Sequence, residues 1–476
     1  MSNFYIEMRK FLLFFFLLLP LFSYSEQPHH WLHIYCNGFD FHSIKIEDVS
    51  SITHSLSTST DLSDSLIVNE KERRLPVALS DVAMCEFGTN VPALYITIPD
   101  FPELEDLTDK ETYLNAVLKV DGNGWFEDLD SAPVLIKGRG NSTWGYPKKP
   151  YRLKFDKKIS ICGFDKSKSY ALIANYIDCT LMRNTIALKI AQLLEMPYTN
   201  HCRPIRVYFN GICKGAYIIT EKIGISGSSV DLDEETGILL ELDSNFDEVY
   251  KFKSAKYDLP VMVKDPDFDE VAEMKGVTPE ALLDTWKNDF EEFEEKVYKD
   301  MDLSDCLDME SFVNYMLVYN ICGNREILWP KSLYMYKRSI DDVYHFGPVW
   351  DFDWAFSYDN GTEDKSPELP LWEGAWDPLK GQPFFKKICS TSEFRMLYKQ
   401  KLDFFKDNLL PLLMDYIDEY IELIEPSAIE NGVLWSPVEG VTSGSFDFNK
   451  NIEMLKQWIS DRMEYISNHR NFGLYD

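Results

Sequence analysis

The sequence predicts an α+β protein in which a small β module precedes a two-lobed body with a β-rich first lobe and a helical second lobe. Runs with strand-like alternation fill the first half of the chain, whereas apolar residues recur at helical spacing after about residue 275. Strands followed by helices in this order are typical of α+β proteins. The 476 residues suffice for about two or three domains. We expect the β module at 26–90, the β-rich lobe at about 91–225 and the helical lobe at about 226–476.

The composition excludes global disorder and disfavours two classes of partner. Hydrophobic residues make up 45% and aromatic residues 14% of the chain, which is enough for a sizeable core. The 48 basic and 78 acidic side chains give a formal charge of −30. Because a nucleic-acid backbone must be neutralised by Lys and Arg, we expect no nucleic-acid partner. The same acidity argues against docking on an anionic membrane surface.

The N-terminus carries the pattern of a secretory signal peptide over residues 1–25. Arg9 and Lys10 precede the apolar run 11–19, and small residues lead up to a cleavage position before Glu26. This run is too short to span a bilayer comfortably, which takes about 20 apolar residues. An uncleaved anchor is the alternative. We therefore expect an exported protein, which is periplasmic, bound at the cell surface or secreted, with no stable membrane span after cleavage.

The cysteine pattern predicts neither a disulfide framework nor a metal site. Nine cysteines are present, without a CxxC pair and without the spacing of Cys/His metal ligands. An odd number in an exported chain leaves at least one thiol free or paired between chains. We expect most of these cysteines to be small buried hydrophobic residues.

Strands are predicted from short runs that alternate between apolar and polar residues. The polar stretch 50–65 is expected to be a loop or a strand edge, and Asn210-Gly211 is the strongest hairpin signal in the chain. The predicted strands are 31–36, 44–46, 93–98, 134–137, 151–155, 205–209 and 216–220.

Helices are predicted from apolar residues at steps of three and four. The first is expected to begin near Asp178 as its N-cap and to end before Pro197. The later helices are expected at 279–299, 309–319, 392–425 and 448–469.

The run 137–155 is the densest signal outside the helices. It contains three glycines, two hydroxyl side chains and an asparagine, which let backbone N–H groups approach an anion closely. Its six basic residues form a positive island in an acidic chain. Lys154, in the middle of a predicted strand, is placed to reach phosphates as the strand lysine of a kinase does. A glycine-rich turn with solvated basic rims is the alternative interpretation.

A second signal is the aspartate pair in the segment 345–356. If the segment is extended, Asp351 and Asp353 project to the same face, because strand side chains alternate. Two neighbouring carboxylates are costly to desolvate unless a cation lies near them. Oxygen ligands of this kind suit Mg²⁺, Mn²⁺ or Ca²⁺. The alternative is an aspartate pair that bonds to nearby arginine or to backbone at a turn.

These motifs resemble the hallmarks of the spore coat protein H (CotH) kinase family. The resemblance begins with the run Gly-Arg-Gly-Asn-Ser-Thr-Trp-Gly and continues to the aspartate pair, over roughly residues 91–470. The segments that carry it, in the order of the family, are 138–154, 174–184, 210–222 and 347–354.

The resemblance implies an atypical protein-kinase-like fold that binds ATP and a divalent metal and phosphorylates surface or coat proteins. It implies that the loop 138–144 covers the phosphates and that residues 220–223 form the hinge beside the adenine. It also implies that Asp351, together with Asp353, holds Mg²⁺ or Mn²⁺. The side chains implied to contact the nucleotide are Arg139, Asn141, Ser142, Lys149, Lys154, Arg183 and Glu221.

Glu326 departs from the pattern expected of an active kinase, which has a catalytic aspartate near this position. A glutamate accepts a proton, but its extra methylene moves the carboxylate by about 1 Å, enough to slow a reaction with tight geometry. Glu326 is therefore a substitute base, a residue for different chemistry or a mark of lost activity. Together with its neighbours Asn324 and Lys331, Glu326 is the sequence feature that discriminates an active kinase from a non-enzymatic binding protein.

The function predicted from the sequence is Mg²⁺- and ATP-dependent phosphoryl transfer to Ser or Thr of an exported or surface protein. ATP is scarce outside the cytoplasm, so such a protein acts during secretion, uses another donor or only binds a ligand. The alternative is a catalytically impaired kinase-like factor for assembly of a coat or cell surface. Such a factor binds protein or glycan through the β module and the aromatic residues of 371–385.

Overall fold

The computed structural model describes residues 30–36, 41–45, 49–55, 65–70, 74–78, 82–89, 91–99, 110–123, 125–356, 366–372, 381–438, 441–468 and 472–474. The chain divides into two compact units, one of residues 1–90 with 123–125 and one of residues 91–122 with 126–476. The predicted signal segment 1–25 lies outside the described residues. Among the described helices, none has the length and apolar character needed to cross a membrane.

The first unit contains two three-stranded antiparallel sheets that share a small apolar core. The strand orders are β2-β1-β6 and β3-β4-β5. β3 lies at an edge of its sheet and occupies the beginning of the polar stretch 50–65, as expected for a strand edge. The strands are β1 (His30–Cys36), β2 (Phe41–Lys45), β3 (Val49–Ser55), β4 (Ser65–Glu70), β5 (Arg74–Ala78) and β6 (Val82–Thr89). The buried core residues are Leu32, Ile34, Ile44, Leu66, Val68 and Val77.

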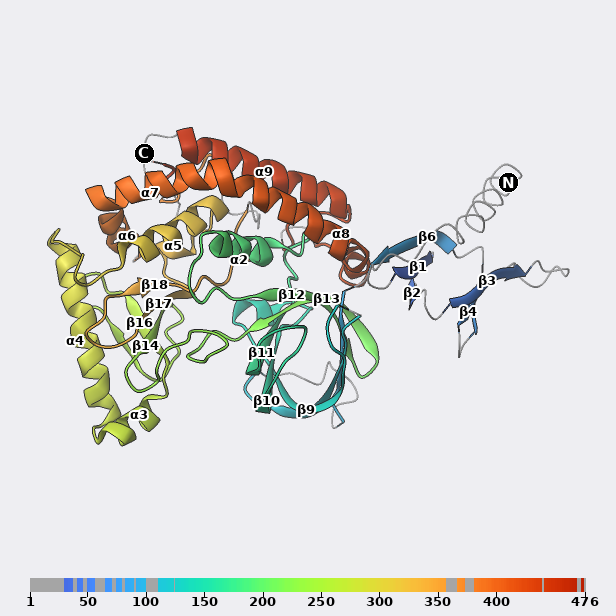
Figure 1. Ribbon diagram of the computed structural model, residues 1–476, viewed down its shortest axis with the longest axis horizontal. Coiled ribbons are helices and arrows are strands. Elements are labelled where there is room, and N and C mark those ends of the chain that lie inside the picture. The colour runs from blue at the N-terminus through green and yellow to red at the C-terminus, as the bar shows by residue number, and fades with distance from the viewer. Residues whose placement is uncertain are drawn as a thin grey trace. The chain divides into compact units, whose positions relative to one another are not determined.

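The second unit begins with a closed seven-stranded barrel in the order β10-β11-β13-β12-β7-β8-β9 (Figure 1). Alternate residues of its strands fill the interior, and Leu118 and Leu153 are fully buried there. The predicted hairpin at Asn210-Gly211 is confirmed, with Phe209 opposite Ile212. The strands are β7 (Ala93–Thr97), β8 (Leu114–Asp121), β9 (Leu129–Gly138), β10 (Tyr151–Ile159), β11 (Ser167–Ile173), β12 (Cys202–Phe209) and β13 (Ile212–Glu221).

A five-stranded sheet follows the barrel in the chain, in the order β15-β16-β14-β17-β18. The helix prediction for this half did not anticipate the sheet. Its strands β14 and β17 are short and buried on both faces, so they lack the polar alternation that marks a half-exposed strand. The strands are β14 (Ile238–Leu242), β15 (Lys251–Lys253), β16 (Pro260–Asp265), β17 (Leu333–Lys337) and β18 (His345–Phe346).

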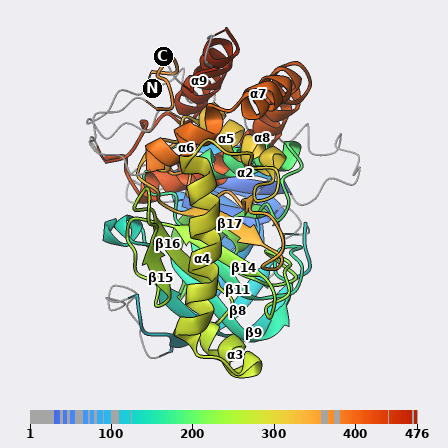
Figure 2. The same cartoon turned by 90° about the vertical axis from the view of Figure 1, so that its left-hand side faces the viewer.

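Helices surround this sheet and form the largest apolar core with it. Figures 1 and 2 show α4 beside the sheet, and the Phe290 ring of α4 lies 5.7 Å from that of Phe252 in β15. The helices of the unit are α2 (Arg183–Leu193), α3 (Phe268–Lys275), α4 (Pro279–Tyr298), α5 (Met309–Cys322), α6 (Gly381–Cys389), α7 (Ser392–Phe404), α8 (Leu410–Leu434) and α9 (Phe448–Asn468).

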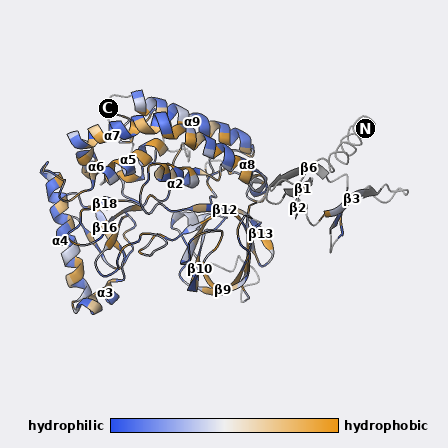
Figure 3. Cartoon of the chain, viewed as in Figure 1, coloured by the Kyte–Doolittle hydropathy of each residue, from blue (hydrophilic) through white to orange (hydrophobic). Residues whose placement is uncertain are grey.

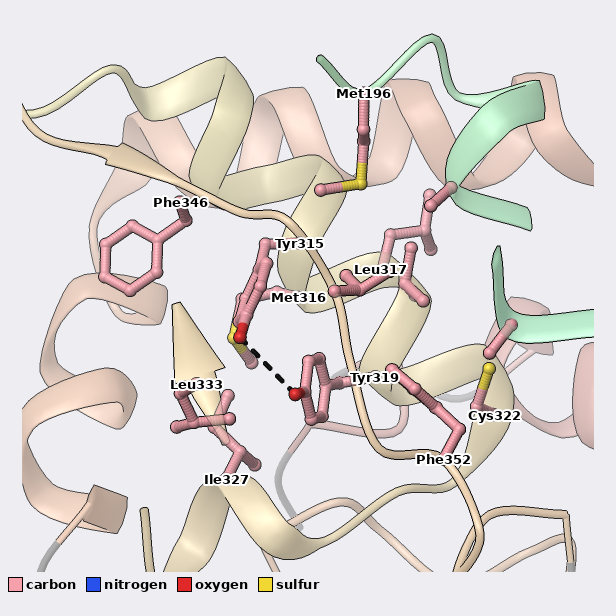
Figure 4. Packing of buried hydrophobic residues seen from close by; sticks show 14 of the residues in the cluster. Met196, Tyr315, Met316, Leu317, Tyr319, Cys322, Ile327, Leu333, Phe346 and Phe352 are labelled. Carbon is pink, nitrogen blue, oxygen red and sulfur yellow. Dashed lines mark hydrogen bonds between the residues drawn. The ribbon is translucent and has the colours of Figure 1, made fainter. Parts of the chain in front are cut away.

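Helix α5 lies within this core, and twelve of its fourteen residues are buried. Tyr315 and Tyr319, one turn apart, share a hydrogen bond of 3.4 Å between their hydroxyl groups (Figure 4). Phe346 and Phe352 pack against these two rings, at 5.5 Å and 5.0 Å between centroids. Phe352 belongs to the segment that carries the aspartate pair, so the core fixes that segment.

Two helix predictions need correction. The first predicted helix begins at Arg183 instead of near Asp178, because the Asp178 carboxylate caps a preceding turn. The predicted helix 392–425 is two helices, α7 and α8, joined by a π-helical turn at Phe405–Leu409. Figure 3 shows that α8 and α9 carry hydrophilic and hydrophobic residues on different sides, as amphipathic helices do.

Seven cysteines whose side chains the structure describes are free thiols. They are Cys162, Cys179, Cys202, Cys213, Cys306, Cys322 and Cys389. Three of the seven are buried and the others half-buried. The sequence predicted that most cysteines would be buried, whereas fewer than half of these seven are.

Candidate functional site

A cavity of about 470 Å³ is lined by residues of both the barrel and the five-stranded sheet. Its walls come from the loop between β9 and β10, from strands β10, β11, β14, β16 and β17, and from the loop after β18. Cavities of this size are typical of small-molecule binding sites.

The lining of this cavity is balanced in charge, although the chain as a whole carries −30. Eight basic and eight acidic side chains contribute to it. The basic residues are Lys110, Lys137, Arg139, Lys148, Arg152, Lys222, Lys264 and Lys331. The acidic residues are Glu111, Glu241, Asp243, Asp247, Glu248, Glu326, Asp351 and Asp353. An anion that would be repelled by the rest of the protein therefore meets a locally neutral site.

The glycine-rich loop forms one wall, and close contacts require glycine at two of its three glycine positions, Gly138 and Gly140. A Cβ atom at Gly138 would lie 2.4 Å from the ring of Trp144, and one at Gly140 would lie 2.1 Å from the Thr143 hydroxyl oxygen. Gly140 also has a φ of +86°, which favours glycine. Lys110 donates from Nζ to the Gly140 carbonyl oxygen at 3.2 Å. The loop is thus held in one conformation against the cavity.

Arg139 extends from this loop toward the aspartate pair. Its backbone N–H donates to the Pro150 carbonyl oxygen at 3.2 Å, which closes the base of the loop. Its guanidinium lies 5.6 Å from the ring centroid of Trp350. Burial lowers the pKa of Arg139, and the charges of Asp351 and Asp353 oppose that shift. The guanidinium therefore supplies a fixed positive charge beside two carboxyl groups.

Asp351 and Asp353 lie in an irregular turn, so strand alternation does not account for their proximity. Asp351 has a φ of +64°, a left-handed conformation that strains any residue except glycine. Two amide side chains hold the turn: Asn324 donates to the Asp351 carbonyl oxygen at 3.2 Å, and Asn184 accepts from the Phe352 N–H at 2.8 Å. Asn184 also donates to Asp353 Oδ1 at 2.5 Å. Both carboxyl groups line the cavity.

The carboxyl groups of this turn are unusually basic. Burial raises the pKa of Asp353 to about 7, with a further contribution from the charge of Asp351. Burial also raises the pKa of Asp351, and Arg139 and Lys331 act against that rise. Two buried carboxylates repel each other, so a cation between or beside them is the natural way to ionise both.

Glu326 lines the same cavity and lies in a short 3₁₀ turn (Glu326–Leu328) after α5. Its backbone N–H donates to Asn324 Oδ1 at 3.0 Å, and Asn324 also holds the aspartate turn. Burial raises the pKa of Glu326 well above its usual range, and the charge of Asp351 raises it further. The Glu326 carboxyl group therefore favours its protonated form.

Six of the ten predicted site residues meet in this cavity. They are Arg139, Asn141, Ser142, Glu326, Asp351 and Asp353. Lys149 and Lys154 do not line it. Lys149 donates from Nζ to the Trp144 carbonyl oxygen at 2.6 Å, so its ammonium group binds the backbone of the loop. Lys154 is exposed and lies 5.7 Å from the ring centroid of Tyr113.

Arg183 and Glu221 also lie outside the lining. Arg183 pairs with Asp178 at 3.6 Å and donates to the Asp353 carbonyl oxygen at 3.5 Å, so it supports the aspartate turn from behind. Glu221 accepts a hydrogen bond from the His201 backbone at 3.0 Å, and its carboxylate lies 2.9 Å from the His201 ring. Neither side chain lines the cavity surface itself.

Several lining residues were missed by sequence reasoning. Arg152 lies two residues before Lys154 on the same face of β10, and strand alternation with buried Tyr151 would have placed it there. Glu241 and Lys264 face each other across β14 and β16 at 2.8 Å. No sequence signal joins these two strands, because only the pairing of the folded sheet brings them together.

The fold and this cavity define an α+β protein with a charge-balanced site closed by a glycine-rich loop. A family model described as CotH kinase protein matches residues 136–466, which is more than half of the chain. The chain therefore belongs to the CotH kinase family, and this membership implies a kinase-like fold. A search of curated proteins found no significant match.

Proposed function

We propose that this chain is an exported kinase-like phosphotransferase that uses Mg²⁺ or Mn²⁺ and ATP to phosphorylate Ser or Thr of an exported or surface protein. The observation that carries the proposal is one cavity lined by both the glycine-rich loop and the aspartate pair. A glycine-rich loop and a pair of carboxyl groups in one cavity are what a metal-bound triphosphate requires. In this proposal the barrel is the first lobe, the sheet with its helices is the second, and the nucleotide binds between them.

The donor set at the aspartate turn fits one divalent ion shared with phosphate oxygens. Mg²⁺ usually binds proteins through one or two carboxylates and completes its shell with water and phosphate. Asp351 and Asp353 supply these two carboxylates. Among the described residues, no three His, Cys, Asp or Glu side chains converge into a metal-binding group. When bound, the ion would neutralise the charge that develops on the transferred phosphoryl group.

The roles of the chain's own residues follow from their positions. Arg139 would orient a phosphate oxygen near the aspartate turn, since its guanidinium is anchored above Trp350. Asn184 would keep Asp353 pointed into the cavity. Glu326 would accept the proton of the acceptor hydroxyl, which requires the ionised carboxylate. Its raised pKa makes that carboxylate a stronger base and a scarcer one at neutral pH.

Export and partner choice belong to the same proposal. The signal peptide at 1–25 would direct the chain out of the cytoplasm, and the β module at 26–90 would contact the surface, the acceptor protein or a glycan. The phosphate donor would be ATP met during secretion or another phosphorylated donor. The strongly acidic chain argues against a nucleic-acid partner.

A catalytically impaired binding protein is the second candidate, and the environment of Glu326 favours it. Burial raises the pKa of Glu326, and a raised pKa disfavours the ionised carboxylate that a general base requires. In this case the protein would bind a nucleotide or related anion and act in coat or cell-surface assembly. The aromatic residues of 371–385 offer little support for glycan binding by this second candidate, because Trp372, Phe384 and Phe385 are buried in the core. Trp376 lies outside the described residues.

The deciding experiment measures label transfer from γ-labelled ATP to a protein acceptor, with Mg²⁺ or Mn²⁺, beside Asp351→Ala. The matched control is Asp341→Ala, which removes an exposed aspartate from a turn outside the cavity lining. We expect transfer by wild type and the control and none by Asp351→Ala. Nucleotide binding without transfer would support the second candidate. An active Asp351→Ala variant would refute the site assignment.

A further inference from the structure

By its spacing along the chain, Lys331 falls where the kinase catalytic loop has a metal-binding asparagine. It lines the cavity, is half-buried and lies two residues before β17 begins. It follows Glu326 by five residues, the spacing that separates the catalytic Asp from the Asn that binds the second Mg²⁺ in the kinase catalytic loop. A lysine carries a positive charge and has no lone pair to offer a metal while it is protonated.

The surroundings of Lys331 are acidic and rigid. Its charge lowers the pKa of Asp351, Glu326 and Asp243, which all line the same cavity. The next residue, Ser332, has a φ of +52° and donates its backbone N–H to Asp243 Oδ2 at 3.0 Å. The Ser332 hydroxyl also bonds to Asp351. The backbone that carries Lys331 is thus tied to two of the carboxyl groups that its charge compensates.

The metal donors on this side of the cavity are correspondingly few. Asp351 and Asp353 are adequate for one ion, and the described residues hold no third His, Cys, Asp or Glu that joins them. An ammonium group on a flexible stem is a compact positive charge, and it binds phosphate oxygens directly. The site therefore offers one aspartate pair for a divalent ion, with the cation of Lys331 acting on the same carboxyl groups.

We propose that Lys331 replaces the second divalent ion, so that this chain binds a nucleoside triphosphate with a single Mg²⁺ or Mn²⁺. The inference rests on the proposed function, because it concerns how the same site holds its nucleotide. It also predicts appreciable nucleotide binding when divalent ions are scarce, since Arg139 and Lys331 remain as phosphate partners. A site that needs two ions would lose its nucleotide under those conditions.

The test counts bound ions and measures affinity without using catalysis. Mn²⁺ bound to the full chain is counted by electron paramagnetic resonance in the presence of a non-hydrolysable ATP analogue. Affinity for the analogue is measured by calorimetry with and without divalent ions. The variants are Lys331→Asn, which restores the metal ligand, and Lys331→Gln, which removes only the charge. The control is Lys287→Asn on α4, whose ammonium makes only a long contact of 3.9 Å with Glu291.

We expect a single bound Mn²⁺ in wild type and in the control, and a second Mn²⁺ in Lys331→Asn. We also expect both Lys331 variants to bind the analogue about tenfold more weakly without divalent ions, which corresponds to ~1.4 kcal/mol. Added Mn²⁺ should restore affinity in Lys331→Asn alone. Two ions in wild type, or metal-free affinity unchanged in both variants, would overturn the inference and leave the proposed function intact. Failure of wild type to bind the analogue at all would overturn both.

Discussion

Replacing Asp353 by asparagine should stabilise the protein, and the gain should grow with pH. Burial raises the pKa of Asp353 from 3.8 to about 7 in the folded state. Below the unfolded pKa both states bind the proton, so folding incurs no ionisation cost. As the pH rises toward 7, the unfolded chain loses the proton while the folded chain keeps it, and the free energy of unfolding falls. Above pH 7 the cost is constant.

The magnitude follows from the two pKa values. A shift of roughly three pKa units corresponds to ~4 kcal/mol at about pH 8.5, and the same linkage gives ~2 kcal/mol at about pH 5.5. The new asparagine side chain would retain an Oδ1 acceptor for the Asn184 amide, which now donates to Asp353 at 2.5 Å. The substitution therefore removes the charge while keeping the hydrogen bond. The advantage of Asp353→Asn should increase by ~2 kcal/mol between the two pH values.

Urea unfolding followed by circular dichroism at both pH values measures this difference. Removing the Asp353 charge also makes Asp351 easier to ionise, which adds to the gain with the same sign. Asp289→Asn is the matched contrast. Asp289 pairs with the buried Lys337 at 2.8 Å and accepts from the Tyr344 hydroxyl at 2.7 Å, so its loss should destabilise by ~3 kcal/mol. An Asp353→Asn variant no more stable than wild type at about pH 8.5 would refute the reasoning. So would an advantage that does not change with pH.

Three further predictions concern the site and its supports. Phosphoryl transfer, if Glu326 is the base, should increase as the pH rises through the raised pKa of Glu326, and Glu326→Gln should abolish it; a flat pH profile of kcat in wild type would exclude this base. Glu430→Ala should lower the free energy of unfolding by ~3 kcal/mol in urea, because it leaves the buried Arg206 without its carboxylate partner at 2.6 Å; a loss below ~1 kcal/mol would contradict this. Gly323→Ala should cost ~1–2 kcal/mol, since its φ is +61° and the new Cβ would lie 2.8 Å from the Trp458 ring; an unchanged thermal midpoint would show that this ring moves freely.

The sequence predicted the helices better than the second sheet, and the reason lies in exposure. Helix α4 is recognisable in the sequence because one side is apolar and the other is charged. Its predicted span 279–299 differs from the observed one by a single residue. Strands β14 and β17 have all five residues buried, so no polar alternation marks them. Their existence depends on tertiary burial that a local pattern does not encode.

The first helix was predicted correctly, but its start was placed too early. Asp178 was expected to cap it, and its Oδ2 does accept from the Arg183 N–H, the first residue of α2, at 3.0 Å. The same carboxylate also caps Thr180, which inserts a turn between the aspartate and the helix. The prediction that Asp178 accepts a hydrogen bond from a helix N–H was therefore correct. The predicted distance in sequence between Asp178 and the start of the helix was too short.

The candidate site was predictable where one continuous motif supplied it. The glycine-rich loop and the aspartate turn were each recognised as units, and they line the same cavity. Asn184 and Asn324 were not recognised as the residues that hold that turn. They lie far from it in sequence, and a lone asparagine carries no pattern that identifies its partner.

The ion pairs of the cavity wall determine which basic side chains are available to bind an anionic ligand. Lys264 is committed, because it pairs with Glu241 at 2.8 Å and with Glu248 at 2.9 Å. Arg139 and Lys331 instead compensate carboxyl groups whose pKa values are raised and whose ionisation is therefore costly. A bound divalent ion would take over that compensation at Asp351 and release both side chains toward the phosphates. In the free protein, ionisation of the buried Asp353 destabilises the fold. A divalent ion that binds the ionised pair in the folded state would offset that destabilisation, because a ligand that binds only the folded state stabilises it.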